Sequence, residues 1–213
     1  MLRLRLKFGR GDKLKFLSHL DMMRLWERSL RRAGMPPCYS EGFSPHPKIS
    51  LAAPLPVGVT SQAEIMDVFL DGRITPNLFI QKIASQLPDG IDIIDVMSVN
   101  LQASSLQSLL RLAEYIVEID SDRDAGQVES EIAALLAKDT LAWHHARDTG
   151  ERHYDLRALI DEIWLAAKTD KGYKIGMRLR CDSSGSGRTE QVIKALGFDR
   201  PPVSVERIKL IFD

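Results

Sequence analysis

Residues 2–8 alternate strictly between apolar and basic side chains. The apolar positions are Leu2, Leu4, Leu6 and Phe8, and the basic positions between them are Arg3, Arg5 and Lys7. A period of two places successive side chains on opposite faces of a β-strand. The segment therefore predicts a half-buried strand, with one face in a hydrophobic core and a cationic opposite face.

The next stretch has the signals of an amphipathic helix. Ser18 is the expected N-cap, Asp21 follows three residues later as in a capping box, and Gly34 supplies the stop. The apolar positions expected on the buried face are Leu20, Met23, Trp26 and Leu30. A helix therefore follows the first strand.

Three further elements complete the first half. Residues 47–57 predict an edge strand or a bent strand because prolines interrupt it, and residues 63–72 alternate as its hairpin partner. A helix begins at the N-cap Thr75 with Pro76 in its first turn, and the apolar strand 91–99 follows it. The resulting order is β-α-β-β-α-β.

The second half repeats this order of patterns without repeating residue identities. The expected elements are a strand at 112–120, a helix at 125–138, a hairpin at 161–181, a helix at 187–198 and a strand at 203–212. We therefore predict an α+β protein made of two tandem ferredoxin-like (β-α-β-β-α-β) units with antiparallel sheets. The expected domains are residues 1–103 and 109–213, separated by an Asn/Gln/Ser-rich linker, and the second contains an insertion at about 139–160.

The charge of the chain is unevenly distributed although its formal total is zero. Residues 1–50 contain eleven Lys/Arg and four Asp/Glu, a net charge of +7, and the remaining residues balance it with −7. Such a basic block fits an anionic partner, with RNA as the first candidate and a merely solvated face as the alternative. No run of about 18 apolar residues and no signal peptide is present, so we expect a cytoplasmic protein that does not enter a membrane.

The expected nucleic-acid-binding residues lie on the first helix and in the segment YSEGFSPHPKIS that follows it. Arg24, Arg28 and Arg31 share one face of the helix, where guanidinium groups can hold phosphates. In the segment, Tyr39 and Phe43 can stack on bases, His46 can donate to a phosphate and Lys48 can pair with one. A solvated helix face and a plain connecting loop are the alternatives.

Other sites have weaker support in the sequence. The five histidines show no HxxxH or HExxH spacing, so we expect no metal, and no motif indicates a cofactor. Ser186, Gly187 and Arg188 form a Gly/Ser-rich entry to a helix, which can attract an anion, although a plain N-cap loop is the favoured interpretation.

The block from Lys15 to Val68, KFLSHLDMMRLWERSLRRAGMPPCYSEGFSPHPKISLAAPLPVGVTSQAEIMDV, resembles the signature of the radical SAM-linked family, DUF2344. The segments HYDLRALIDEI and GSGRTEQVIKALGF resemble its later portion. The resemblance implies a radical SAM protein with a cobalamin-binding type of domain as partner, for which this chain would be a helper or would recognise the substrate. The expected architecture also resembles that of CRISPR RNA-processing endonucleases, an analogy of fold alone.

Three hypotheses follow. The first is a noncatalytic RNA-binding or substrate-presenting partner of the radical SAM enzyme. The second is a metal-independent RNA-processing enzyme in which His19 or His46 moves protons and an arginine stabilises the developing charge. It requires these histidines to lie close to each other or to Tyr39 in one cleft. The third is a protein-docking subunit that does not bind RNA.

Overall fold

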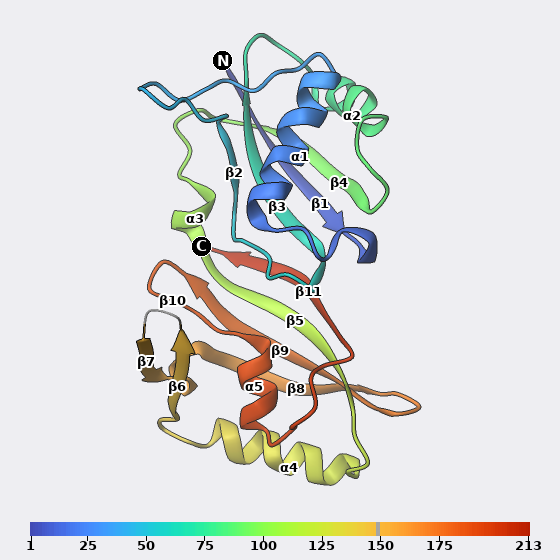
Figure 1. Cartoon of the computed structure of the whole chain (residues 1–213), viewed down its shortest axis with the longest axis vertical. Coiled ribbons are helices and arrows are strands. Elements are labelled where there is room, and N and C mark those ends of the chain that lie inside the picture. Colours follow the sequence, from blue (N-terminus) through green and yellow to red (C-terminus); the bar gives the residue numbers. More distant parts are fainter. Residues whose placement is uncertain (148–149) are drawn as a thin grey trace. The chain divides into compact units, whose positions relative to one another are not determined.

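Helices and strands follow one another along the chain in the computed structural model, which describes residues 1–147 and 150–213 (Figure 1). β1 pairs antiparallel with β3 and β4, β2 with β3, and β9 with β5 and β8. The expected mixed α+β class with mostly antiparallel strands is therefore confirmed. The chain divides into two units, residues 1–110 and 111–213.

The first unit combines a four-stranded arrangement with three helices. Its strands are β1 (Leu2–Arg10), β2 (Ile49–Leu51), β3 (Thr60–Leu70) and β4 (Ile91–Val99). Its helices are α1 (His19–Arg32), α2 (Pro76–Ala84) and the short α3 (Leu106–Leu109). The strands lie in the order β2-β3-β1-β4.

The core of this unit lies between the sheet and the two longer helices. Leu6 in β1 pairs with Met66 in β3 and Val96 in β4, and all three are buried. Trp26 of α1 and Phe79 of α2 belong to the same buried cluster. Both helices therefore cover one face of the sheet, because removal of this apolar surface from water stabilises the packed arrangement.

The rotation of α1 differs from the expected one. The Ser18 side chain caps the helix as predicted, accepting a hydrogen bond from the Asp21 backbone N–H at 3.2 Å. The buried stripe, however, runs through Met22, Trp26 and Leu30, whereas Leu20 is 65% exposed. The prediction for Leu20 was wrong because the i, i+4, i+8 series that starts at Met22 contains Trp26, the largest fully buried side chain.

The expected cationic face of β1 is largely neutralised. The Asp67 carboxylate forms ion pairs with Arg3 Nη2 at 2.6 Å and with Arg5 Nε at 2.8 Å. Arg3 is only 4% exposed. Arg3 also donates to the backbone oxygens of Ala103 (2.6 Å) and Ser104 (2.9 Å), which holds residues 103–104 against this unit. Arg3 and Arg5 are therefore structural, whereas Lys7 of the same strand is exposed.

The second unit has a comparable order of elements. Its main strands are β5 (Leu110–Asp120), β8 (Ile160–Lys168), β9 (Gly172–Asp182) and β11 (Ser204–Phe212). Its helices are α4 (Ala125–Leu136) and α5 (Thr189–Ala195). β5 pairs with β9 and with β11, while β8 and the two-residue β10 (Gly185–Ser186) also pair with β9.

One glycine is required in this second sheet. Gly176 of β9 pairs with Trp164 of β8. A Cβ atom at position 176 would lie only 2.0 Å from the Trp164 ring. The missing side chain therefore makes room for the indole to lie across the neighbouring strand.

The insertion predicted at about 139–160 contains a hairpin. β6 (Ala142–Arg147) pairs with β7 (Gly150–Asp155), and a 3-10 turn at Arg157–Leu159 follows. Residues 148 and 149 of the expected insertion lie outside the described residues. Within the described part of the chain, no helix is long and apolar enough to cross a membrane.

Removing the Asp67 carboxylate, which pairs with Arg3 and Arg5, should lower the stability of the protein strongly. Asp67→Asn leaves the buried Arg3 guanidinium without its carboxylate, and we expect it to lower the free energy of unfolding by about 3 kcal/mol. Urea denaturation followed by circular dichroism measures this change. Asp89→Asn is the matched control, because Asp89 pairs with Lys13 where both side chains are exposed, and it should leave the free energy of unfolding nearly unchanged. Equal losses in the two variants would contradict the role given to Asp67.

Candidate functional site

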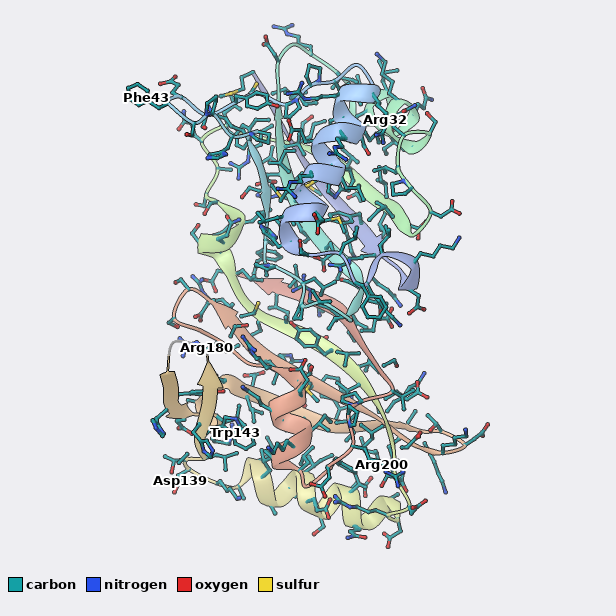
Figure 2. All side chains as sticks on the ribbon, in the orientation of Figure 1. Arg32, Phe43, Asp139, Trp143, Arg180 and Arg200 are labelled. Carbon is teal, nitrogen blue, oxygen red and sulfur yellow. The ribbon has the colours of Figure 1, made fainter. Side chains whose placement is uncertain are left out.

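Three arginines of α1 line one wall of an open groove. Arg24, Arg28 and Arg32 recur every four residues, which places successive Cα atoms about 6 Å apart along the helix axis. The opposite wall comes from residues 85–88, which follow α2. The groove has a volume of about 610 Å³, and Figure 2 shows Arg32 near the end of α1.

The three arginines differ in their bonding. Arg24 Nη1 lies 3.4 Å from Asp21 Oδ1, a marginal ion pair, while Arg32 Nη2 donates to the Gln86 carbonyl at 2.7 Å. Within the described residues, Arg28 has no hydrogen bond or ion pair and is exposed. Arg28 is therefore the guanidinium most readily available to an incoming anion.

Asp21 is the acidic group in this groove. The Ser18 hydroxyl donates to its carboxylate at 2.7 Å, and this hydrogen bond, with help from Arg24, holds the pKa of Asp21 below its ordinary value. Asp21 is therefore ionised at neutral pH. Three guanidinium groups and one carboxylate leave the groove with a net positive charge.

Arg31 does not belong to the groove, although the sequence grouped it with Arg24 and Arg28. Its guanidinium lies 5.6 Å from the centre of the Tyr39 ring and donates to the Tyr39 hydroxyl. Arg31 Nη2 is also 3.2 Å from Glu27 Oε1, which accepts a hydrogen bond from Tyr39. These contacts anchor Tyr39 to α1, while the Arg31 side chain is still 56% exposed.

The segment after Tyr39 forms a closed loop with an exposed tip. Tyr39 and Pro47 pair at its base, and the Ser40 N–H donates to the His46 carbonyl at 2.8 Å. The His46 N–H in turn donates to Ser40 Oγ at 2.9 Å. Phe43 lies at the outer end of the loop, fully exposed and pointing away from the sheet (Figure 2). The closed base therefore holds Phe43 at an exposed apolar tip.

The remaining loop residues take different positions. His46 is exposed, whereas Lys48 is half-buried and its backbone N–H donates to Cys38 at 2.7 Å. His19 is the first residue of α1, at the opposite end of the helix from the loop. The axial distance between His19 and Arg31 is about 18 Å, so α1 separates the two histidines proposed for proton transfer.

In the Gly/Ser-rich loop of the second unit, backbone N–H groups donate hydrogen bonds to the preceding strand. The Gly187 N–H donates to the Arg180 carbonyl at 2.9 Å, while Ser184 and Gly185 donate theirs to Asp182. Burial raises the pKa of Asp182, but hydrogen bonds from Ser184 and Arg180 outweigh it, so this pKa lies well below its usual range. The Gly187 N–H is thus bonded within the protein, while Ser186 and Arg188 on either side of it are exposed.

The histidines do not assemble a metal site in the described part of the chain, where no three His, Cys, Asp or Glu side chains converge. His144 and His153 pair across β6 and β7 with ring centres 6.3 Å apart. The side chain of His145 lies outside the described residues.

The wall formed by residues 85–88 was missed by the sequence analysis. These residues are ordinary polar and apolar types after a helix, and no local signal marks them. Their position opposite α1 depends on tertiary contacts such as the Ser29 hydroxyl donating to the Gln86 carbonyl at 3.0 Å. Arg32, which was not among the expected binding residues, donates to the same carbonyl and completes the arginine wall.

Comparisons with known proteins identify a family and a shared fold. The model of the family described as "Uncharacterized protein conserved in bacteria (DUF2344)" matches residues 3–189. The chain is similar to a chain in "Crystal Structure of a Cbf5-Nop10-Gar1 Complex", with 8% identity, a TM-score of 0.54, and coverage of 96% of this chain and 47% of that one.

A second similar structure is "Crystal structure of the archaeal box H/ACA sRNP Nop10-Cbf5 complex", with 8% identity and a TM-score of 0.48, covering 96% of this chain and 46% of that one. The chain thus spans about half the length of the chains it resembles, and the likeness concerns the fold alone. No curated protein matches it.

The Tyr39 anchor can be tested by removing one hydroxyl. We expect Tyr39→Phe to speed hydrogen exchange at the backbone amides of Ser40 and His46 by up to about tenfold, because the loop base loses its bonds to Glu27 and Arg31. Tyr173→Phe, which removes a hydroxyl bonded to the Arg123 carbonyl in the other unit, is the control and should leave these amides unchanged. Unaltered exchange in Tyr39→Phe would show that the loop is closed without this anchor.

Proposed function

This chain belongs to the family of uncharacterized proteins conserved in bacteria, DUF2344, and we propose that it is a noncatalytic RNA-binding protein that presents a substrate to a radical SAM enzyme. The observation that carries the RNA proposal is the groove with Arg24, Arg28 and Arg32 along one wall. Guanidinium groups bind phosphate oxygens with two parallel hydrogen bonds, and RNA offers phosphates in a regular series.

The proposed interface extends from the groove to the loop after α1. Phe43 can stack on a base, and His46 and Lys48 can contact phosphates beside it. Arg31 and Tyr39 stabilise this surface, because their mutual contacts fix the base of the loop. The interface thus combines positive charge with one exposed aromatic ring.

We also propose that each unit is a ferredoxin-like domain, with boundaries near residues 1–103 and 109–213. The strand orders β2-β3-β1-β4 and β8-β9-β5-β11 support this, since in each unit the first and third main strands are central. A helix follows the first strand and another follows the third, as in a split β-α-β repeat. The proposed RNA interface would lie entirely on the first of these domains.

A ribonuclease role gains no support from the site. Proton transfer requires a base and an acid within hydrogen-bonding reach of one substrate bond. His19 and the loop that contains His46 lie at opposite ends of α1. We therefore keep the proposal noncatalytic.

Salt dependence tests the arginine groove. If Arg28 neutralises one phosphate, Arg28→Ala should weaken RNA binding about fivefold at low salt and reduce the slope of log affinity against log salt by about 0.7 to 0.9. Fluorescence anisotropy with a labelled RNA measures both quantities. Arg73→Ala is the matched control, because Arg73 is also exposed in the first unit but lies outside the groove, and it should leave the slope unchanged. Identical slopes for wild type and Arg28→Ala would remove Arg28 from the interface.

The proposed enzyme partner is supported by the resemblance to the radical SAM-linked family and needs its own test. We expect this chain to co-elute in size-exclusion chromatography with a co-expressed radical SAM protein that has a cobalamin-binding type of domain. An unrelated radical SAM protein is the control. Separate elution of the two proteins at micromolar concentrations would contradict the partnership and leave the RNA proposal standing.

A further inference from the structure

The groove has an apolar floor as well as a cationic wall. Leu17, Leu25, Leu87 and Pro88 line it between the arginines of α1 and the end of α2. Leu25 and Leu87 are only partly buried, with one side against the core of the unit. Covering this apolar surface with a ligand removes it from water, which favours binding.

The floor discriminates between forms of RNA. A duplex turns its bases inward and offers mainly phosphates and riboses, so it could satisfy the arginines but not the apolar floor. An unpaired strand exposes base faces and phosphates together, and the faces of bases pack favourably on apolar and aromatic side chains. The two surfaces of the groove therefore match a single strand better than a duplex.

Phe43 adds an independent apolar contact in the same unit. Its side chain is fully exposed on a loop whose base is closed by the Tyr39–Pro47 pair and by hydrogen bonds between Ser40 and His46. Arg31 already lies near the Tyr39 ring, which is partly buried, so Phe43 is the more accessible aromatic side chain of this loop. An exposed ring on a closed loop loses little conformational entropy when it binds.

We infer that this site selects single-stranded RNA, with phosphates on Arg24, Arg28 and Arg32, one or more bases against the Leu25–Leu87 floor, and another base on Phe43. The inference rests on the proposed RNA-binding function and adds the class of RNA. Selectivity would come from stacking and not from hydrogen bonds to base edges, so we expect little dependence on sequence.

Three probes of equal length separate the contributions of bases and phosphates. They are a labelled oligouridylate of about 12 nucleotides, the same strand paired with oligoadenylate, and an abasic ribose-phosphate strand, all measured by anisotropy at low salt with the full chain. We expect the single strand to bind at least about tenfold more tightly than either the duplex or the abasic strand.

Phe43→Ala should weaken binding of the single strand about fivefold or more and leave the abasic strand unaffected. Phe16→Ala is the matched control, because Phe16 is 72% exposed in the same unit but lies outside the proposed site. Both positions are exposed, so neither substitution removes core packing.

The outcomes distinguish this inference from the proposed function. Equal affinity for the single strand and the duplex, or for the single strand and the abasic strand, would overturn the inference while RNA binding by phosphates stands. Equal effects of Phe43→Ala and Phe16→Ala would overturn the assignment of Phe43. Absence of binding to all three probes at low salt would overturn both the inference and the proposed function.

Discussion

The packing of Trp26 against Phe8 sets the orientation of α1, on which the candidate site depends. The two rings meet edge to face with centres 4.9 Å apart, and both are completely buried. Within the described residues, Trp26 Nε1 is a buried polar atom without a hydrogen-bond partner, a cost that the packing of so large a ring must offset. Any rotation of α1 would expose Trp26 to water. The arginines at positions 24, 28 and 32 are therefore directed to the groove by an apolar contact on another face of the helix.

Burial also divides the basic residues of the first 50 positions into two groups. Arg3 and Arg5 share Asp67, and Arg10 donates to the backbone carbonyls of residues 14, 15 and 17 at 2.7 to 3.0 Å. These three guanidiniums hold the ends of β1 and the following turn in place. The charge that can meet an anionic partner is consequently smaller than the sequence total of +7 and is concentrated on α1. A local excess of charge identifies a binding surface only after its internal partners are known.

The loop after α1 combines a fixed base with an unsupported tip. Tyr39 is bound to Glu27 and Arg31, and Ser40 and His46 bond to each other, so the chain is constrained on both sides of Phe43. At Gly42 the backbone has φ of +118°, a value that residues with a Cβ rarely adopt. Exposing a phenylalanine costs free energy in the isolated protein, and constraint of the loop reduces the entropy lost when that side chain is covered.

Outside the insertion at about 139–160, the sequence by itself determined the order of the main helices and strands and many of their limits. Period-two and helical patterns, the caps Ser18 and Thr75, and Gly197 after α5 act through neighbours a few residues away, and the structure has elements at these places. The α+β class followed from that order. Local patterns failed where a residue's surroundings come from distant parts of the chain.

Only the tertiary structure decided which charges remain available and where the groove lies. Arg3 looked solvent-facing because Asp67, 64 residues away, does not appear in its local pattern. Leu20 looked buried until the packing of Trp26 set the rotation of α1. Arg32 joined the site through Gln86, 54 residues away. Local sequence specifies the backbone's hydrogen-bonding pattern over a few residues, whereas burial and ion pairing depend on contacts that exist only after the sheet and helices have packed.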